Sequence, residues 1–144
     1  MLPSDERIAR ALIETRTIAL VGASMKPERA SHRVGNYLAS VGYRVIPINT
    51  GYVGKMLFGQ TVVGRLSDIQ EDVHLVDIFR KSEDVLPVVQ EALASLSGLR
   101  VIWMQLGIRN AEARALAKTH ALTVVEDRCT AVEHRRFFAG AKSA

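Results

Sequence analysis

The stretch "TIALVGASMKPERASHRVGNYL", residues 17–38, decides the fold class of this chain. It begins with an apolar run that ends at Gly22, continues through a long loop, and then places Val34 and Leu38 at helical spacing. A buried strand, a glycine turn and a helix in this order are typical of the first unit of a nucleotide-binding α/β fold. The dinucleotide fingerprint requires further glycines, however, and Ser24 stands where the second of them would be.

The same alternation of strand and helix continues along the chain. Further apolar runs lie at residues 43–49, 73–79, 99–107 and 122–127, and helical patterns separate them. This order favours right-handed βαβ units and a parallel sheet. The sequence therefore predicts a Rossmann-like, doubly wound α/β fold of about five strands in a single domain, residues 1–144, with an N-terminal helix over residues 1–15 packed on it.

Capping residues suggest where the helices begin. Ser4 and Ser31 are predicted caps of the first two helices, and Asn110 of a later one. The segment "TAVE", residues 130–133, has the pattern of a capping box and predicts the start of a terminal helix. Pro87 is tolerated only near a first turn, so the helix around it is expected to open close to residue 84.

Composition limits the classes of function. The 144 residues carry a net charge of +4, which permits an anionic partner. No apolar run approaches the roughly 18 residues of a membrane span, and the N-terminus lacks the pattern of a secretory signal, so a cytoplasmic protein is expected. Cys129 is the only cysteine, which excludes an intramolecular disulfide and a cysteine-rich zinc site. We expect no metal site.

Basic residues gather after the ends of the predicted strands. They are Lys26, Arg29 and Arg33 after the first strand, Arg80 and Lys81 after the third, Arg109 after the fourth and Arg128 after the fifth. Because parallel strands end at one edge of the sheet, where ligands bind, this pattern favours a ligand with several phosphates. The alternative interpretation is a set of ordinary polar loops.

The second strand argues against NAD. It ends in "PINTGY", with Asn49 and no acidic residue to hold the hydroxyls of a ribose. NADP is less firmly excluded, because its additional phosphate prefers arginine. The loop after the first strand is long for a strand-to-helix turn, and Pro27 stiffens it. Such a loop can reach over a ligand.

Five segments in order resemble the CoA-binding domain family. They are "VGASMKPERASHRVGNYL", "GYRVIPIN", "VDIFR", "VIWMQLGI" and "DRCTAVEHRR". The family consists of small stand-alone Rossmann-like proteins similar to the nucleotide-binding domain of the succinyl-CoA synthetase alpha subunit. The resemblance covers residues 16–138.

The resemblance implies coenzyme A as the ligand. It places Gly22, Ala23, Ser24 and Lys26 near the phosphates, with Pro27, Arg29 and Ser31 close by. It places Asn49, Phe79 and Arg80 on the adenosine side, and Gln105, Leu106 and Gly107 along the pantetheine channel.

Activity is not settled by the resemblance. The synthetase needs a phosphorylated histidine in a second domain and an ATP-grasp partner, and this chain has neither. Cys129 follows the fifth strand, so one hypothesis is that it meets the thiol end of CoA. His134 lies on another face of the expected helix, which makes a catalytic Cys–His pair doubtful.

Three interpretations of the function therefore stay open, and a fourth is disfavoured. The leading one is a protein that binds CoA or an acyl-CoA without established catalysis. The alternatives are an NAD(P)-binding module and an acyl-CoA-processing enzyme that uses Cys129. A nucleic-acid binder is disfavoured because no aromatic residues interleave the cations. A protein partner or a homodimer remains possible.

Overall fold

The computed structural model describes residues 3–138 and contains one five-stranded parallel sheet. Its strands run in the order β2, β1, β5, β6, β7. Their bounds are β1 Thr17–Val21, β2 Arg44–Ile48, β5 Leu75–Ile78, β6 Val101–Met104 and β7 Thr123–Val125. The order reverses direction between β1 and β5, which makes the carboxyl ends of these two strands the switch point of a doubly wound fold. The predicted fold class is confirmed.

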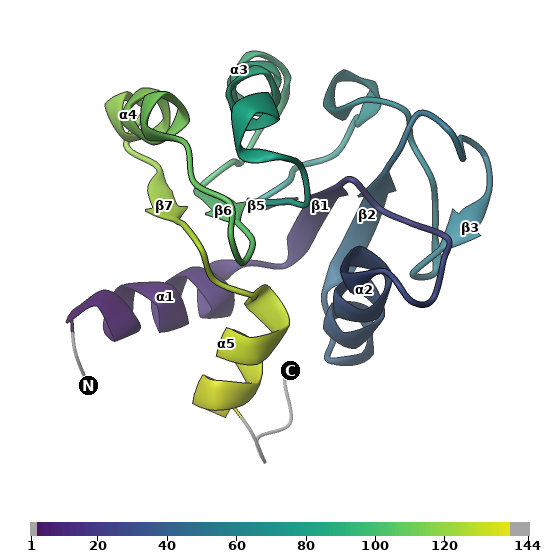
Figure 1. Cartoon of the computed structure of the whole chain (residues 1–144), viewed down its shortest axis with the longest axis horizontal. Coiled ribbons are helices and arrows are strands. Elements are labelled where there is room, and N and C mark those ends of the chain that lie inside the picture. The colour runs from purple at the N-terminus through teal and green to yellow at the C-terminus, as the bar shows by residue number, and fades with distance from the viewer. Residues whose placement is uncertain (1–2, 139–144) are drawn as a thin grey trace.

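Helices cover both faces of the sheet (Figure 1). Their bounds are α1 Pro3–Glu14, α2 Ala30–Ser40, α3 Val85–Ser95, α4 Ala111–Thr119 and α5 Thr130–Phe138. In Figure 1, α1, α2 and α5 lie below the sheet, and α3 and α4 lie above it. Short 3-10 turns at Leu66–Asp68 and Ser82–Asp84 complete the second face. Within the described part of the chain, no helix is long and apolar enough to cross a membrane.

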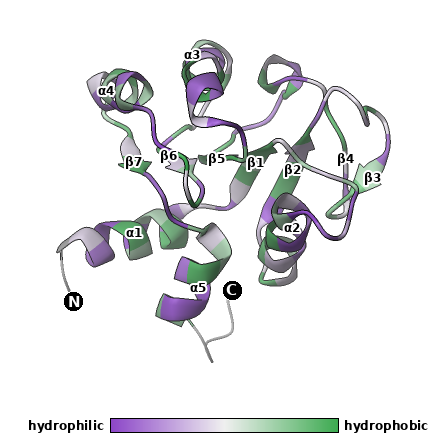
Figure 2. Ribbon diagram, viewed as in Figure 1, coloured by the Kyte–Doolittle hydropathy of each residue, from purple (hydrophilic) through white to green (hydrophobic). Residues whose placement is uncertain are grey.

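Side chains of β1 alternate between the two layers. Ile18 and Leu20 belong to the core under α1, α2 and α5, whereas Ala19 and Val21 belong to the core under α3 and α4. All four are buried, and Figure 2 shows the central strands largely in the colour of hydrophobic residues. A strand covered on both faces needs apolar residues at every position, which explains why the sequence reads as a continuous apolar run.

A small hairpin, β3 Met56–Leu57 and β4 Gln60–Thr61, follows β2. Val63, just after the second strand of the hairpin, makes a single parallel bridge to Ile48. Phe58 in the hairpin turn packs against α2, where a Cβ on Gly35 would lie 2.2 Å from its ring. Gly35 therefore allows the hairpin to rest on the helix.

Two of the predicted caps are wrong. Helix α2 begins at Ala30 with Arg29 at the N-cap position, and Arg29 makes no capping side-chain bond. Ser31 is buried inside the first turn. Ser4 is the second residue of α1 and does not precede it. Asn110 caps α4 as predicted, because its Oδ1 accepts a hydrogen bond from the Ala113 amide.

Candidate functional site

A groove of about 610 Å³ lies beyond the carboxyl ends of β1, β2, β5 and β6. It is lined by every predicted site residue except Pro27 and Gly107: Gly22, Ala23, Ser24, Lys26, Arg29, Ser31, Asn49, Phe79, Arg80, Gln105 and Cys129. The remaining lining residues are Ala30, Val34, Tyr52, Lys81, Leu106 and Ile108. The groove thus occupies the switch point of the fold, where ligands of doubly wound sheets bind.

The turn after β1 brings two strand ends close together. Gly22 has φ +88°, and a Cβ there would lie 2.3 Å from the carbonyl oxygen of Phe79. Only glycine combines this backbone conformation with such a close approach. The amides of Gly22 and Ala23 both donate to the carbonyl of Ile48. These contacts hold the loop over the ends of β1, β2 and β5.

The loop from Ser24 to Arg29 forms the outer wall of the groove. Ser24 Oγ accepts from the Lys26 amide, and the Arg29 amide donates to Lys26 O at 3.0 Å. Pro27 is the second residue of the resulting turn, where its fixed φ is favourable. His32 Nδ1 lies 2.8 Å from Ser24 O, and because a carbonyl can only accept, Nδ1 carries the proton. Pro27 shapes this loop without lining the groove.

Four cations line the groove: Lys26, Arg29, Arg80 and Lys81. Among the described residues, Arg80 has an ion pair, to Asp84 at 3.8 Å, and the ion pairs do not include the other three. The first turn of α2 also faces the groove through Ala30 and Ser31. Unpaired cations beside a helix N-terminus suit an anionic ligand group.

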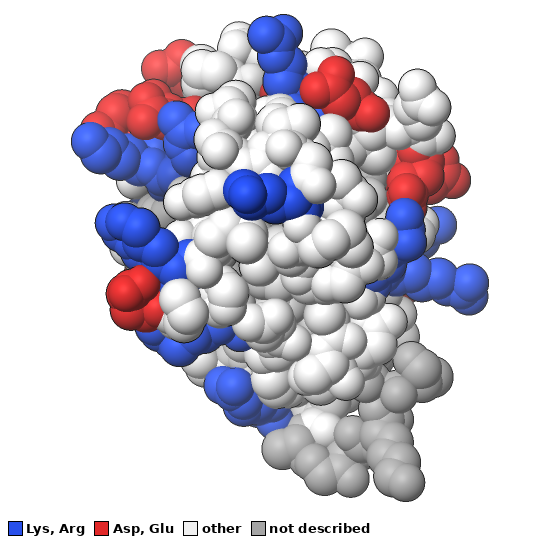
Figure 3. Space-filling model, turned by 90° about the vertical axis from the view of Figure 1, so that its right-hand side faces the viewer, with Lys and Arg blue, Asp and Glu red and all other residues white. Residues whose placement is uncertain are grey.

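The other predicted cations are used elsewhere. Arg33 donates to the carbonyl of Glu28, and Arg109 pairs with Asp127 at 3.0 Å. Arg128 lies 3.6 Å from Glu133. The cationic part of the groove is therefore smaller than the strand-end pattern suggested. Figure 3 looks at the β3–β4 side, where much of the surface is uncharged and the Lys and Arg side chains are dispersed.

Asn49 joins two of the loops that surround the groove. Its Nδ2 donates to Ala23 O and its Oδ1 accepts from the Gly51 amide, both at 2.7 Å. The side chain thus ties the β1–α2 loop to the segment after β2. Its first role is to hold the shape of this part of the groove.

A buried polar network forms part of the groove floor. Asp77 lies in β5 with no exposed surface, and its Oδ1 accepts from Gln105 Nε2 at 2.6 Å. Its Oδ2 accepts from Thr130 Oγ1 at 2.8 Å, and Thr130 Oγ1 in turn accepts from Gln105 Nε2 at 3.0 Å. Burial raises the pKa of Asp77 to about 7, although both hydrogen bonds act to lower it.

The same network explains why the predicted capping box is wrong. Helix α5 does begin at Thr130, but the hydroxyl of Thr130 bonds to Asp77 and Gln105 and caps no amide. The carboxylate of Glu133 pairs with Arg128 and Arg136. Tertiary partners have therefore replaced the local ones that the sequence pattern suggested.

The loops after β6 and β7 are joined beside the groove. Gly107, with φ +80°, donates its amide to Asp127 Oδ1 at 2.6 Å, and Arg109 donates to Asp127 Oδ2. The bond from Gly107 and the contact with Arg109 lower the pKa of the Asp127 carboxyl. Gly107 thus serves this connection and does not line the groove.

Cys129 lines both the groove and an adjoining hollow of about 400 Å³. The hollow shares Leu106 with the groove as well, and Val132 and several charged residues complete it. His134 is buried on another side of α5, where Nδ1 lies 2.8 Å from Tyr37 Oη. Burial, with a contribution from Arg135, lowers the pKa of His134. The ring contacts of His134 are with Tyr37 of α2, Tyr43 after it and Phe138 of α5, and not with Cys129.

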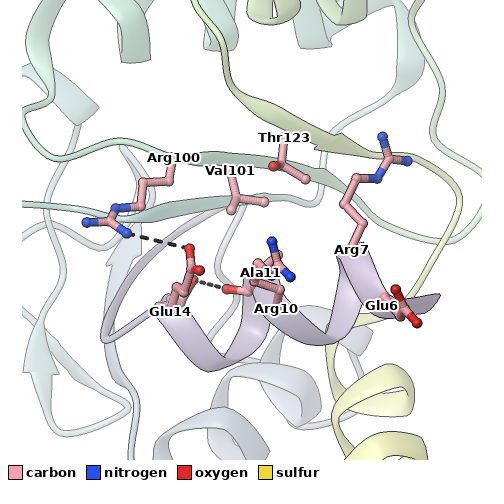
Figure 4. A pocket seen from close by; sticks show the side chains of 9 residues that line it. Glu6, Arg7, Arg10, Ala11, Glu14, Arg100, Val101 and Thr123 are labelled. Atoms are coloured by element: carbon pink, nitrogen blue, oxygen red, sulfur yellow. Dashed lines mark hydrogen bonds and ion pairs between the residues drawn. The ribbon is translucent and has the colours of Figure 1, made fainter. Parts of the chain in front are cut away.

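A separate hollow of about 270 Å³ lies at the opposite edge of the sheet (Figure 4). Helix α1 forms one side of it, and Arg100 at the start of β6 pairs with Glu14 across it at 3.5 Å. Its charges are mixed, and it lies at the amino ends of the strands, where doubly wound folds do not bind ligands. No cluster of possible metal ligands occurs within residues 3–138.

Sequence reasoning missed Ala30, Val34 and Tyr52, which line the groove from α2 and from the segment after β2. The strand-end rule selects loop residues, so it does not detect Val34 in the helix that faces them, whereas Tyr52 lies in a loop that the rule selects and was not singled out there. Ile108 was missed because it lies beyond the glycine turn that follows β6. Lys81 and Leu106 were recognised as residues near strand ends.

Comparison with known proteins agrees with this geometry. The model of a family described as CoA binding domain matches residues 16–135. The Bacillus subtilis protein YneT, described as uncharacterized, is 35% identical over 132 residues, which are 92% of this chain and 95% of YneT. A solved Thermus thermophilus structure is 38% identical with a TM-score of 0.87, and the match covers 93% of this chain and 98% of that one.

A larger protein contains a similar unit. The acetyl-coenzyme A synthetase 1 of Ca. Korarchaeum cryptofilum is 25% identical with a TM-score of 0.65, over 80% of this chain and 26% of that chain. The family model covers most of the present sequence, including all four strand ends that form the groove. The chain therefore belongs to the CoA-binding domain family.

Proposed function

We propose that the groove binds coenzyme A or an acyl-CoA through its phosphates. The observation that carries this proposal is the convergence of Lys26, Arg29 and Lys81, none of them in the ion pairs of the described residues, on a groove at the switch point. CoA carries a pyrophosphate and a 3′-phosphate, which suit cations and a helix N-terminus. Membership of the CoA-binding domain family supports the same ligand.

The proposed orientation follows from what lines the two ends of the groove. Tyr52 and Phe79 offer aromatic and apolar surface for the adenine near the ends of β2 and β5. Gln105 and Leu106 line the other end, which leads to Cys129. The pantetheine arm would extend along this end, so that the thiol lies near the hollow beyond Cys129. An acyl group on that thiol would occupy the hollow.

The proposed role is binding without turnover by this chain alone. An acyl-transfer reaction at Cys129 would need a base within hydrogen-bond reach of the thiol. His134 instead contacts Tyr37, and Asp127 is engaged by Gly107 and Arg109. The adjoining hollow favours the enzyme as a second candidate, because it offers room for an acyl group next to the thiol. Hydrolysis of acetyl-CoA that disappears in Cys129→Ala would establish this second candidate and refute the first.

Thermal denaturation with added ligands tests the binding proposal. A ligand at about 100 times its dissociation constant stabilises a folded protein by about 2.7 kcal/mol, which corresponds to about 9 °C in a domain of this size. We expect CoA to raise the melting temperature by this order and NAD to have little effect. An equal or larger effect of NADP would favour an NADP-binding module and would refute CoA as the ligand.

A pair of lysine variants tests the position of the phosphates. Lys26→Gln removes a cation that lines the groove, and Lys118→Gln makes the same change on α4, away from it. We expect calorimetry to show about tenfold weaker CoA binding for Lys26→Gln, because a charge-assisted hydrogen bond is lost, and no change for Lys118→Gln. Equal affinities for the two variants would contradict the proposed phosphate site.

A further inference from the structure

The side-chain amide of Gln105 has a fixed orientation at the groove floor. Its Nε2 donates both hydrogens to buried acceptors, Asp77 Oδ1 at 2.6 Å and Thr130 Oγ1 at 3.0 Å. The Thr130 hydroxyl donates its only hydrogen to Asp77 Oδ2, so toward Gln105 Nε2 its oxygen can act only as an acceptor. Above pH 7, where Asp77 is ionised, its carboxylate accepts hydrogen bonds and donates none, so the amide nitrogen must face Asp77.

The amide oxygen of Gln105 therefore points away from the network. No hydrogen bond to Oε1 occurs among the described residues, and no buried side-chain nitrogen or oxygen among them lacks a partner. Oε1 must then retain some exposed surface. Gln105 is only 4% exposed, and the cavity that it lines is the groove, so that surface opens into the groove.

We propose that Gln105 Oε1 is a hydrogen-bond acceptor for an amide N–H of the pantetheine arm, and that Asp77 and Thr130 are the residues that position it. This inference rests on the proposed binding of CoA. Pantetheine contains secondary amides, each of which has one N–H to donate. An acceptor held by buried partners loses little freedom when the ligand binds, so the hydrogen bond costs little in conformational entropy.

The arrangement also gives specificity. A ligand group that brings an acceptor or an apolar atom to this point would leave Gln105 Oε1 without a donor at a nearly buried position, which is unfavourable. At pH 8 the amide cannot turn to offer its nitrogen, because the turn would place its oxygen against the ionised carboxylate of Asp77. The floor of the groove therefore selects for a donor at this position.

Two ligands separate this role from a general effect on the fold. CoA contains the pantetheine arm, and adenosine 3′,5′-bisphosphate shares the adenosine end and lacks the arm. For Gln105→Met at pH 8 we expect about fivefold weaker binding of CoA, since one neutral hydrogen bond is lost, and unchanged binding of the bisphosphate. Dethio-CoA, which keeps the amides and lacks the thiol, should lose as much affinity as CoA.

Thr130 supplies a matched pair of variants for the positioning role. Thr130→Ser keeps the hydroxyl and should bind CoA as the unaltered protein does. Thr130→Val removes it and frees one hydrogen of Gln105 Nε2, so CoA binding should weaken about threefold while binding of the bisphosphate stays unchanged.

Several results would overturn the inference. They are equal losses of both ligands in Gln105→Met, unchanged CoA affinity in that variant, identical behaviour of the two Thr130 variants, or a loss that dethio-CoA does not share. If the unaltered protein failed to bind CoA at all, the proposed function itself would be refuted, and that result is distinct from these.

Discussion

Replacement of Asp77 by asparagine should change how stability depends on pH. Burial raises the pKa of this carboxyl to about 7 in the folded protein, against 3.8 for an unperturbed aspartate. Between these values the folded protein keeps a proton that the unfolded chain has released. The free energy of unfolding therefore falls as the pH rises through this window. The two pKa values are about 3 apart, which corresponds to about 4 kcal/mol at 1.36 kcal/mol for each pH unit.

Asparagine has nearly the shape of protonated aspartate and does not titrate. At pH 4 we expect Asp77→Asn and the unaltered protein to have similar free energies of unfolding. At pH 8 the variant should be more stable by about 4 kcal/mol, because the unaltered protein then carries a buried charge without a cation beside it. Urea denaturation at several pH values measures this difference.

The quantity to compare is the difference in free energy of unfolding between Asp77→Asn and the unaltered protein at each pH. His134 also titrates with a lowered pKa, so acid destabilises the fold through this residue while it stabilises the fold through Asp77. His134 is present in both proteins, and its effect cancels. Asp68→Asn, in an exposed turn, controls for the substitution itself. A difference between Asp77→Asn and the unaltered protein that stays constant from pH 4 to pH 8 would refute a raised pKa at Asp77.

Two further predictions concern the frame around the groove. Gly22→Ala should cost about 3 kcal/mol of stability, because its Cβ would meet Phe79 O at 2.3 Å in a left-handed backbone conformation. Gly59→Ala has a similar φ and open space, so urea denaturation should show a loss of only about 1 kcal/mol, and equal losses would argue against the collision. Tyr37→Phe removes the hydrogen bond to His134 and should cost about 1 kcal/mol in the same measurement, whereas unchanged stability would show that this bond contributes nothing.

The strands and their alternation with helices were predictable because these patterns depend on residues that are close in the sequence. A strand buried on both faces must be apolar throughout, so β1 could be recognised from its composition. The strand-end rule then placed most of the groove, since carboxyl ends of parallel strands meet at one edge. Asn110 was recognised as a cap because its partner, Ala113, lies three residues away.

The predictions about caps and cations were wrong where a side chain binds a residue that is distant in the sequence. Thr130 has the position of a helix cap, but its hydroxyl is used by Asp77, which lies 53 residues earlier. Ser31 could not cap because the helix begins before it. The pattern of charges showed that Arg109 and Arg128 lie near the sheet edge, but it did not show that carboxylates occupy both of them.

The bonds between the loops after β6 and β7 have a consequence for how a ligand enters and leaves. Asp127 receives hydrogen bonds from Gly107 and Arg109 and donates its own amide to Ile108, so these two loops move as one body. The loop around Pro27 is exposed, and the side chains of His32 and Arg33 attach it to α2 through the carbonyls of Ser24 and Glu28. The wall around Pro27 is therefore the more exposed of the two walls of the groove. Exchange of the ligand should follow the motion of this exposed loop, so the rate of release should depend on the loop that carries Lys26 and Arg29, two of the proposed phosphate-binding residues.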